Sequence, residues 1–304
     1  MRLKHWTLLL IAAFGWGAGG VITRAAFNEG LDPVGFSAYR SAVAAIVVLS
    51  YRLARRGRLG LGRRAWRAGA VLGTINLAVP FLLLTIAVSF ASAGFVGLLV
   101  ANIPIGTAVW AHLLGEEKID APRAVGLGVA LSGVMLLLLS GDSGLDEGGN
   151  PTLAIGLSLI GLAFASYSIL FAKRATATLD PVSIAGPQFV VGTGLLLLLV
   201  PFTDGVPSEV TTAGWALVVA AGLLSTALPF LVFYTALPNI SATQASLVGY
   251  VVPLVSIVLG VAWLDERVTA AIAAGGALIL GGIVLADRAA AQGRPAPTIT
   301  GQPE

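Results

Sequence analysis

The stretch AGAVLGTINLAVPFLLLTIAVSFASAGFVGLLVANIPIGTAVWAHLLG, residues 68–115, runs for 48 positions without a lysine, arginine, aspartate or glutamate. A second uncharged stretch, residues 210–264, runs for 55 positions. One membrane-spanning helix needs only about 20 apolar residues, because the hydrocarbon core is about 30 Å thick and a helix rises about 1.5 Å per residue. Each stretch is therefore predicted to fold into two spans joined by a tight turn, at 89–92 and at 237–241.

Shorter apolar segments on either side of these stretches supply the other spans. Five carry no charged residue, and the segment 33–51 carries only Arg40. The sequence therefore predicts an all-α integral membrane protein with ten transmembrane helices. They are expected near 5–26, 33–54, 68–88, 92–114, 121–140, 152–173, 181–202, 211–236, 241–264 and 269–288.

The composition supports a membrane protein and excludes several other classes. The chain is 57% hydrophobic and only 11% charged, whereas about 25% of the residues of a soluble domain are charged. It has no cysteine and only two histidines, so neither a disulfide, a thiolate site nor a histidine metal cluster is expected. No metal or other cofactor is predicted, and nucleic acid is not an expected partner, since the basic residues lie beside apolar spans.

The distribution of basic residues predicts the orientation. Fifteen of the 18 lysines and arginines fall on one side of a ten-span arrangement, with Arg24 and Arg267 on the other side and Arg40 within a helix. Lysine and arginine are enriched in cytoplasmic loops. The N- and C-termini of this multi-pass protein are therefore expected in the cytoplasm.

The two halves of the chain share residues at a nearly constant offset. Leu-Asp-Pro-Val at 31–34 recurs at 179–182, and Pro-Phe-Leu at 80–82 recurs at 229–231. At an offset of 149, Pro104, Glu117, Gly126 and Gly133 coincide with Pro253, Glu266, Gly275 and Gly282. The series predicts one five-helix repeat over 1–141 and a second over 148–288, followed by a disordered cytoplasmic tail over 289–304.

Five helices per repeat is an odd number, so the second repeat is expected to sit inverted in the membrane. The halves of an inverted pair can exchange shapes, which opens a site near the midplane to one side and then to the other. This arrangement favours a carrier. A membrane enzyme would need a nucleophile or metal constellation, which the sequence does not offer, and a receptor or scaffold without transport would not need inverted halves.

Several of these residues also carry a resemblance to a known family. They are Phe-Gly-Trp-Gly at 14–17, Tyr-Arg-Ser at 39–41, and, within 242–266, Leu247, Gly249, Tyr250, Pro253 and Leu-Asp-Glu at 264–266. In order and spacing they resemble the EamA-type branch of the drug/metabolite transporter superfamily, over roughly residues 8–139 and 155–286. The resemblance implies export of amino acids or other small metabolites across the inner (plasma) membrane of a bacterial cell. Gln188 in place of a second Arg40, and Phe164 in place of a second Trp16, depart from a symmetric site.

Arg40 is the most informative residue within a span. It lies seven residues into its helix, about 10 Å deep, where an arginine costs about 2.5–3.5 kcal/mol on insertion scales. Its planar guanidinium could bind a substrate carboxylate or phosphate. Alternatively it is structural, bonded to carbonyls or to Asn76, or it extends to the outer surface.

Other polar and aromatic residues in the spans are candidates for a substrate site. Buried amides need hydrogen-bond partners, and tyrosine and tryptophan combine an apolar body with a polar tip. Bonds and packing between helices are the alternative roles for each of them. With Arg40, the predicted substrate-binding residues are Trp16, Tyr39, Asn76, Asn102, Tyr167, Gln188, Gln244 and Tyr250.

The prolines at 80, 104, 229 and 253 form repeat-related pairs. A proline removes a backbone hydrogen bond and kinks a helix, so Pro80, Pro104, Pro229 and Pro253 are predicted hinges of gating helices. Ordinary tolerance of proline in membrane helices is the alternative.

The absence of certain features from the sequence narrows the function. The fifteen acidic residues are assigned to turns, loops or tails and none lies deep in a predicted span, whereas an exporter of cationic drugs usually needs a buried acid. No Walker-type loop for ATP is present. The sequence therefore predicts a secondary carrier of a small zwitterionic or anionic metabolite, in the first place an amino acid, moving outward. It is expected to be a monomer or weak dimer in contact with its substrate and membrane lipids. A scaffold or receptor, or a carrier of nucleobases, sugars or drugs, is the alternative.

Overall fold

The structure is a computed structural model that describes residues 3–56, 62–145, 147–203, 210–240 and 248–292. In the first half of the chain, the third and fourth spans are composite. The helices are α1 (Leu3–Asn28), α2 (Pro33–Arg56), α3 (Arg63–Leu72), which continues through a π-helical turn (Gly73–Ala78) into α4 (Val79–Phe90), α5 (Ala93–Val100), α6 (Ile103–Leu113) and α7 (Ala121–Ser140).

The second half repeats this order. Its helices are α8 (Pro151–Thr176), α9 (Pro181–Leu197), which is followed by a 3-10 turn (Val200–Phe202), α10 (Thr212–Ala220), which continues through a π-helical turn (Ala221–Ala227) into α11 (Leu228–Ala236), a 3-10 turn (Leu237–Asn239), α13 (Val248–Leu264) and α14 (Ala270–Gln292). A π-helical turn therefore occurs in the third span of each half.

The described helices agree closely with the predicted spans. Nine helical segments in the described ranges are long and apolar enough to cross a membrane, and Val248–Leu264 is a shorter apolar helix. The predicted ninth span starts at 241, and residues 241–247 lie outside the described ranges. Of the predicted tail over 289–304, the first four residues belong to α14 and the remainder lies outside the described ranges. The chain is thus an all-α, multi-pass membrane protein made of two five-helix repeats.

The repeated Leu-Asp-Pro-Val motif begins the second helix of each half. Asp32 Oδ1 accepts hydrogen bonds from the backbone N–H of Val34 and Gly35, both at 2.9 Å. Asp180 accepts from Ser183 N in the same way, at 3.2 Å. In each half the aspartate caps the helix, and the proline after it occupies a position where its missing N–H costs nothing.

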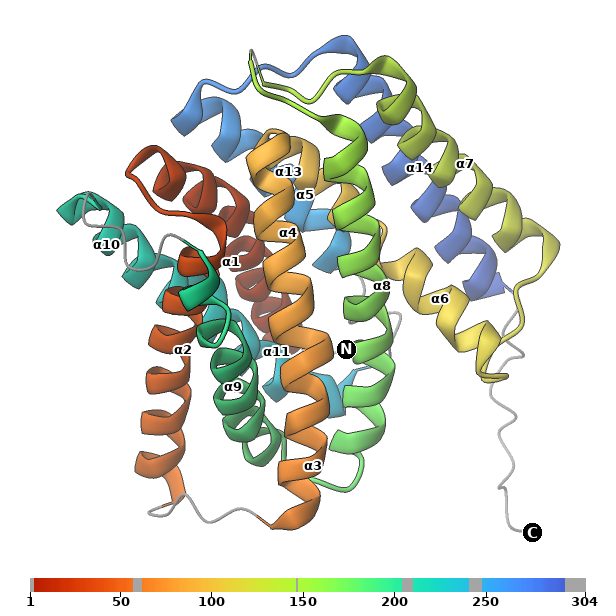
Figure 1. The fold of residues 1–304 in the computed structure, drawn as a ribbon. Helices are drawn as coiled ribbons and strands as arrows, with labels where there is room; N and C mark the ends of the chain where they lie inside the picture. Colours follow the sequence, from red (N-terminus) through yellow and green to blue (C-terminus); the bar gives the residue numbers. More distant parts are fainter. Residues whose placement is uncertain (1–2, 57–61, 146, 204–209, 241–247, 293–304) are drawn as a thin grey trace, which may run out of the picture.

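The loops gather at two ends of the helix bundle (Figure 1). We call the end that carries residues 29–32, 141–145, 147–150 and 265–269 the distal end. There Ser92 N donates to Ser143 O at 2.9 Å, and Asn150 N donates to Phe90 O at 2.8 Å. The opposite, proximal end carries the turns 114–120 and 177–180, and it is held by a salt bridge between Arg174 and Glu116.

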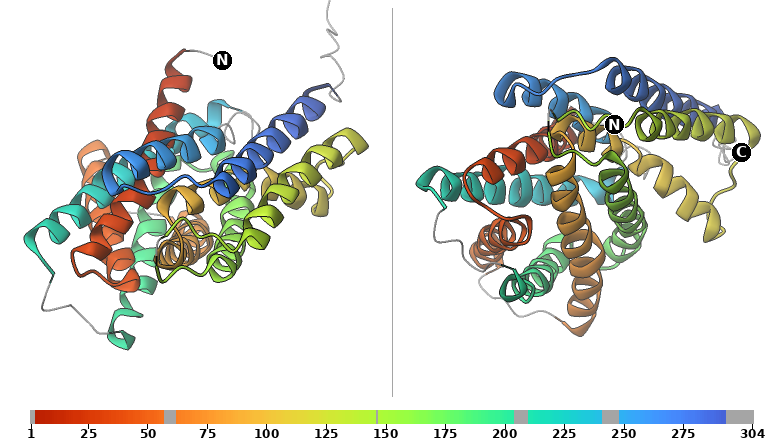
Figure 2. Two further views of the ribbon diagram at one scale, coloured as in Figure 1. Left: turned by 90° about the horizontal axis from the view of Figure 1, so that it is seen from above. Right: turned by 45° about the horizontal axis from the view of Figure 1, so that its top comes forward.

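α7 and α14, the last helices of the two halves, lie side by side at one edge of the molecule (Figures 1 and 2). They are in backbone contact at two points. A Cβ atom at Gly126 would fall 2.8 Å from Gly282 O, and one at Gly133 would fall 2.6 Å from Gly275 O. Because Gly126 is equivalent to Gly275 and Gly133 to Gly282, the repeat relation exchanges these two contacts. The pair therefore has the pseudo-twofold symmetry that inverted repeats require.

The same symmetry relates the contacts of the third spans. A Cβ atom at Gly73 would fall 2.7 Å from Gln188 O, and one at the equivalent Gly222 would fall 2.8 Å from Arg40 O. The third span of each half thus packs on the second helix of the other half. These contacts bring the positions of Arg40 and Gln188 beside the two π-helical turns.

Each π-helical turn precedes a proline, Pro80 in α4 and Pro229 in α11. A proline has no N–H to donate to the carbonyl four residues before it, and its ring clashes with that carbonyl. The extra residue of a π-helical turn relieves this clash, and such turns are frequent at functional sites. The sequence predicted kinks at these prolines and did not predict the π-helical turns.

The fourth span is broken close to Pro104, where the sequence predicted a kink. Asn102 Nδ2 donates to the backbone carbonyl of Leu99 at 3.0 Å, in competition with the helix. α5 ends at Val100 and α6 begins at Ile103. α5 packs on α13, whereas α6 packs chiefly on α8. The two halves of this span therefore have different neighbours.

Candidate functional site

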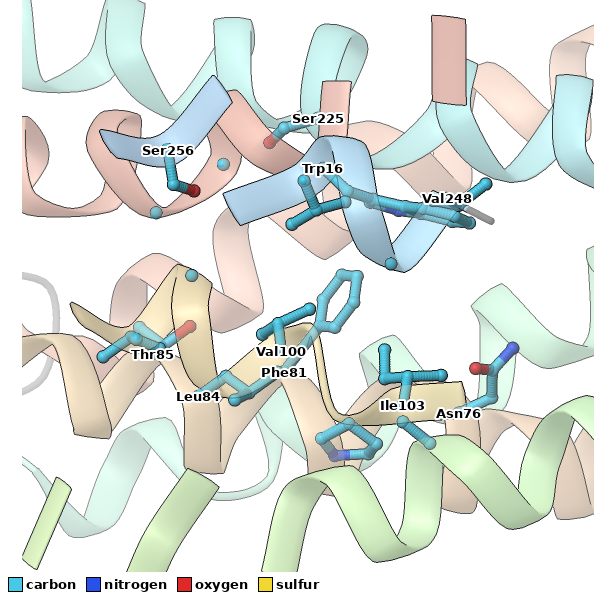
Figure 3. A pocket seen from close by; sticks show the side chains of 18 of the residues that line it. Trp16, Asn76, Phe81, Leu84, Thr85, Val100, Ile103, Ser225, Val248 and Ser256 are labelled. Carbon is cyan, nitrogen blue, oxygen red and sulfur yellow. The ribbon is translucent and has the colours of Figure 1, made fainter. Parts of the chain in front are cut away.

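A cavity of about 190 Å³ lies between the two halves of the protein. Figure 3 shows Trp16, Ser225, Val248 and Ser256 on one side of it, and Phe81, Thr85 and Asn76 facing them from the other. Most of the lining is apolar. Its polar members are Thr23, Arg40, Asn76, Thr85, Ser168, Ser225, Tyr234 and Ser256.

Arg40 is the only charged residue of the described chain that lines this cavity. The residue is 7% exposed, and its guanidinium carbon lies 4.3 Å from the ring centroid of Phe81 and 5.6 Å from that of Phe36. Within the described ranges no hydrogen bond or ion pair reaches the guanidinium, and its Nε is buried without a partner. The aromatic faces stabilise the cation and leave its N–H donors unused.

The structural roles considered for Arg40 are not observed in the described chain. Asn76 bonds to Tyr234 and Ser168 instead, and burial of the side chain rules out extension to the surface. A buried charge normally has a partner, since leaving it unpaired is costly. The arrangement can therefore accept an anionic group into the cavity.

A hydrogen-bonded cluster of neutral side chains forms another part of the cavity wall. Asn76 Nδ2 donates to Tyr234 Oη at 3.3 Å, and Ser168 Oγ donates to Asn76 Oδ1 at 2.8 Å. The Tyr234 hydroxyl in turn donates to Gln188 Oε1. Since Asn76 belongs to the first repeat and the other three to the second, this cluster joins the halves.

Aromatic rings form a further part of the cavity wall. Trp16 contacts Phe230 and Phe233 edge-on, at centroid distances of 5.6 and 5.3 Å. Phe230 also contacts Phe81 at 5.9 Å. This apolar surface surrounds the few polar groups, as is typical of a small-molecule site.

The structure brings some of the predicted site residues together at this cavity and places others elsewhere. Trp16, Arg40 and Asn76 line it, as does Pro80. Gln188 is completely buried behind Tyr234 and reaches the cavity only through that hydroxyl. Gln244 lies outside the described ranges.

The remaining predicted residues lie outside the described cavity lining. Tyr39 packs against Trp215, and Tyr167 against Trp110. Asn102 is buried at the helix break, with its Oδ1 unpartnered. The hydroxyl of Tyr250 donates to Asp287 Oδ2 at 2.6 Å.

The predicted hinges at Pro104, Pro229 and Pro253 also lie outside the described cavity lining. Pro104 is close to Gly249, Pro229 to Gly15 and Pro253 to Gly97. Each thus lies where a proline of one helix meets a glycine of another. Their role as hinges stays a prediction.

The assignment of every acidic residue to a turn, loop or tail is wrong for Asp287, although this residue does not lie deep in its span. This residue belongs to α14, close to the proximal end, and bonds to Tyr250 of α13. A carboxylate near a helix end needs only one hydrogen-bonding neighbour and partial access to polar surroundings. The sequence did not show that Tyr250 would face it.

Sequence reasoning did not select Ser168, Ser225, Thr85 or Ser256 for the site. The internal repeat contained a signal for two of them. At an offset of 149, Asn76 coincides with Ser225 and Thr85 with Tyr234. Once one member of such a pair is assigned to a central cavity, inverted symmetry assigns the other.

Comparisons with known proteins agree with this architecture. The model of the EamA-like transporter family matches residues 4–139 and 152–286, one match for each repeat. "Uncharacterized protein PA1977" of Pseudomonas aeruginosa is 28% identical over 92% of this chain and 93% of its own length. "Uncharacterized inner membrane transporter YedA" of Escherichia coli (strain K12) is 26% identical over 86% of this chain and 84% of its own.

A solved crystal structure shares the fold. It superposes with a TM-score of 0.69 over 96% of this chain and 99% of that chain, at 17% sequence identity.

Proposed function

This chain belongs to the EamA-like transporter family, and we propose that it is a secondary carrier of small zwitterionic or anionic metabolites, amino acids first among them. It is a membrane transporter rather than an enzyme. The cavity, of about 190 Å³, is of a size that suits a small metabolite such as an amino acid. Its polar groups are few, so the cargo combines an apolar part with one or two charged or polar ends.

The observation that carries this proposal is the guanidinium of Arg40, which has no hydrogen-bonding or ion-pair partner in the described chain. A buried arginine with unused N–H donors favours a ligand that brings a negative charge, and a carboxylate matches its planar fork with two parallel hydrogen bonds. Phe81 holds the guanidinium from one face at 4.3 Å. The fork is thereby positioned before the substrate arrives.

The neutral cluster around Tyr234 suits the other end of the cargo. The Tyr234 hydroxyl gives its proton to Gln188 and receives one from Asn76, so its remaining lone pair can accept from a substrate donor. The carbonyl oxygen of Asn76 and the hydroxyl of Ser168 also have unused acceptor capacity. An ammonium or hydroxyl group of the substrate fits these acceptors.

Alternating access is the mechanism that the two-repeat architecture supports. The symmetric contacts of α7 with α14, and of each third span with α2 or α9, give two interchangeable arrangements of the halves. In the arrangement described, α5 contacts α13 and α6 contacts α8. Exchange of these contacts between the repeats would expose the cavity to the opposite side.

Placement in the bacterial inner membrane with cytoplasmic termini is part of the proposal. It is supported by the excess of basic residues on the segments of the proximal end and by the inner-membrane transporter among its relatives. With that orientation the proximal end faces the cytoplasm. Export is the direction consistent with the family resemblance.

The test is counterflow of radiolabelled amino acids in proteoliposomes. Wild type is expected to exchange at least one of them, and Arg40→Ala is expected to lower that exchange about 100-fold, the loss expected for one charge-assisted bidentate pair. Arg40→Lys should be intermediate, since lysine keeps the charge but not the fork. Arg64→Ala, which removes an exposed arginine at the start of α3, is the control and should behave as wild type.

Three outcomes would change the proposal. Normal exchange by folded Arg40→Ala would make Arg40 structural. Exchange of nucleobases or sugars but of no amino acid would replace the cargo. No exchange of any of these by wild type would favour a scaffold or receptor.

A further inference from the structure

The distal end of the cavity is closed by a contact between the two repeats. Glu266 follows the end of α13, and its Oε1 accepts a hydrogen bond from Ala93 N at 2.6 Å. Its Oε2 accepts from Gly94 N at 3.0 Å. Ser92 Oγ accepts from Phe95 N at 3.1 Å. The first three N–H groups of α5 are thus satisfied, and two of them by a carboxylate from the other half.

This contact lies between two cavities. Ala93 lines the central cavity, as do Arg40 and Val96. Glu266 lines a polar cavity of about 280 Å³ at the distal end, together with Arg24, Asn28, Gly144, Leu145, Glu147, Leu264, Asp265 and Arg267. The contact of Glu266 with α5 therefore forms part of the wall that separates the substrate site from the distal cavity.

The turn after α13 is built to direct Glu266 toward α5. Asp265 has a φ of 52°, in the left-handed region that residues other than glycine rarely adopt. Glu266 N then donates back to Gly260 O at 3.1 Å. A Cβ atom at Gly260 would fall 2.4 Å from Glu266 Oε2. A glycine at 260 thus leaves the space in which the carboxylate lies.

The repeat-related carboxylate is in a different environment. Glu117 is equivalent to Glu266, yet it pairs with Arg123 at 2.9 Å and its side chain is 41% exposed. Inverted repeats that occupy different states are expected when one end of a carrier is closed. Glu266 is engaged across the halves at the distal end, whereas Glu117 bonds within its own repeat.

The packing beneath Glu266 agrees with a closed distal end. A Cβ atom at Gly97, one turn below Ala93, would fall 2.5 Å from the Cβ of Ser256 in α13. A Cβ atom at Gly94 would fall 3.3 Å from Cγ1 of Ile257 in α13. α5 and α13 thus touch along the distal half of the fourth span, where Glu266 joins their ends.

We propose that Glu266 is the latch of the distal gate, and that its release from Ala93 and Gly94 opens the substrate cavity to the distal side. A carboxylate at a helix N-terminus is favoured both by the two N–H donors and by the helix dipole. Separation of α5 from α13 must break these bonds. The proposal rests on the alternating-access part of the proposed function, but its test needs neither a substrate nor flux.

The test measures access to the cavity from the distal side. The chain has no cysteine, so Val96→Cys supplies a single thiol at a buried, cavity-lining position. A membrane-impermeant methanethiosulfonate is applied to intact cells and to inverted vesicles. Asp142→Cys, at a partly exposed position of the distal loop, identifies the preparation that presents the distal end.

Glu266→Gln is expected to raise distal labelling of Val96→Cys about tenfold, the shift expected from losing a charge-assisted hydrogen bond. Glutamine has one acceptor oxygen, so its NH₂ group would face the second backbone donor. Gly260→Ala is expected to act in the same direction, because its Cβ displaces the carboxylate without touching α5. Glu147→Gln changes a carboxylate of the same distal cavity and should leave the labelling rate unchanged.

Unchanged distal labelling in folded Gly260→Ala and Glu266→Gln would overturn the latch. An equal rise in Glu147→Gln would overturn it too, since the effect would then come from the charge of the distal cavity. If Glu266→Gln fails to fold, Gly260→Ala alone decides the question. Failure of the counterflow assay would leave this result untouched, because labelling reports access and not transport.

Discussion

Arg40 and Gln188 occupy equivalent positions in the two repeats, and their chemical difference makes the cavity asymmetric. Arg40 lies against aromatic faces without a hydrogen bond in the described chain. Gln188 is fully buried and bonded to Tyr234. The symmetric scaffold therefore presents one cationic and one neutral polar group. A cargo with a carboxylate and a separate donor would bind in one orientation.

The Tyr234 hydroxyl is expected to contribute to both stability and transport. Tyr234→Phe removes the partner of Gln188 Oε1 and of Asn76 Nδ2, and a buried polar group left without a partner costs about 1–3 kcal/mol. Thermal unfolding in detergent should show a lower midpoint for Tyr234→Phe. Tyr39→Phe is the matched control, because the Tyr39 hydroxyl is buried and has no hydrogen-bond partner in the described chain. Equal losses in both variants would contradict this assignment.

At the residue scale, the sequence identified Arg40 as an unusual residue within a span but predicted only some of the residues that line the cavity with it. Arg40 is buried, which excludes the extension to the surface that the sequence had left open. The cavity includes Trp16 and Asn76, but its described lining does not include Tyr39, Tyr167 or Tyr250. Which way a side chain faces depends on the rotation of its helix, and an apolar span of a membrane protein carries only a weak signal of that rotation.

Elements pack in this protein through glycines and through interruptions of regular helix. The two π-helical turns lie at equivalent positions, next to Pro80 and Pro229. Each adds a residue to its turn and so shifts the faces of the helix beyond it by about 100°. Asn76 and Ser225, which line the cavity, belong to these turns.

The α7–α14 contact predicts that alanine substitutions at two adjacent glycines have different effects on the free energy of unfolding. A Cβ atom at Gly282 would fall 2.3 Å from Ala130 N, whereas one at Gly281 would meet no atom within 4 Å. Gly282→Ala is therefore expected to lower the free energy of unfolding by about 1–3 kcal/mol. Gly281→Ala should raise it by about 0.5–1 kcal/mol, because alanine favours the helix.

Reversible unfolding of the two variants in mixed detergent micelles measures this difference. Equal stability of Gly281→Ala and Gly282→Ala would show that α7 and α14 are not in backbone contact at this point. The difference between adjacent positions matters most, since helix propensity affects both substitutions equally.

At the scale of the whole molecule, the distribution of charges over the two ends of the fold predicts which end of the protein faces the cytoplasm. The proximal end contains Lys173 and Arg174 at the end of α8 and Arg123 at the start of α7. The distal loops contain Asp142 and Glu147. Basic segments remain in the cytoplasm, so the distal end is expected outside.

Fusions to reporter enzymes test this orientation. Alkaline phosphatase fused after Leu145 should be active, because it would be exported with the distal loop, whereas the same enzyme fused after Gly115 should be inactive. A fluorescent protein fused after Gly115 should fluoresce. The reverse pattern would invert the proposed topology and with it the side to which the latch at Glu266 opens.

The sequence by itself determined the number of spans, the two repeats and their inversion, and it singled out Arg40. These features follow from the lengths of apolar segments, the positions of charges and a constant offset, all of which are local or one-dimensional. Only the tertiary structure decided that Asn76, Ser168, Gln188 and Tyr234 form one cluster and that Glu266 reaches the start of α5. Those contacts join residues from 46 to 173 positions apart. They depend on helix rotation, on the π-helical turns and on the state in which the two halves are packed, none of which an apolar segment encodes in its own pattern.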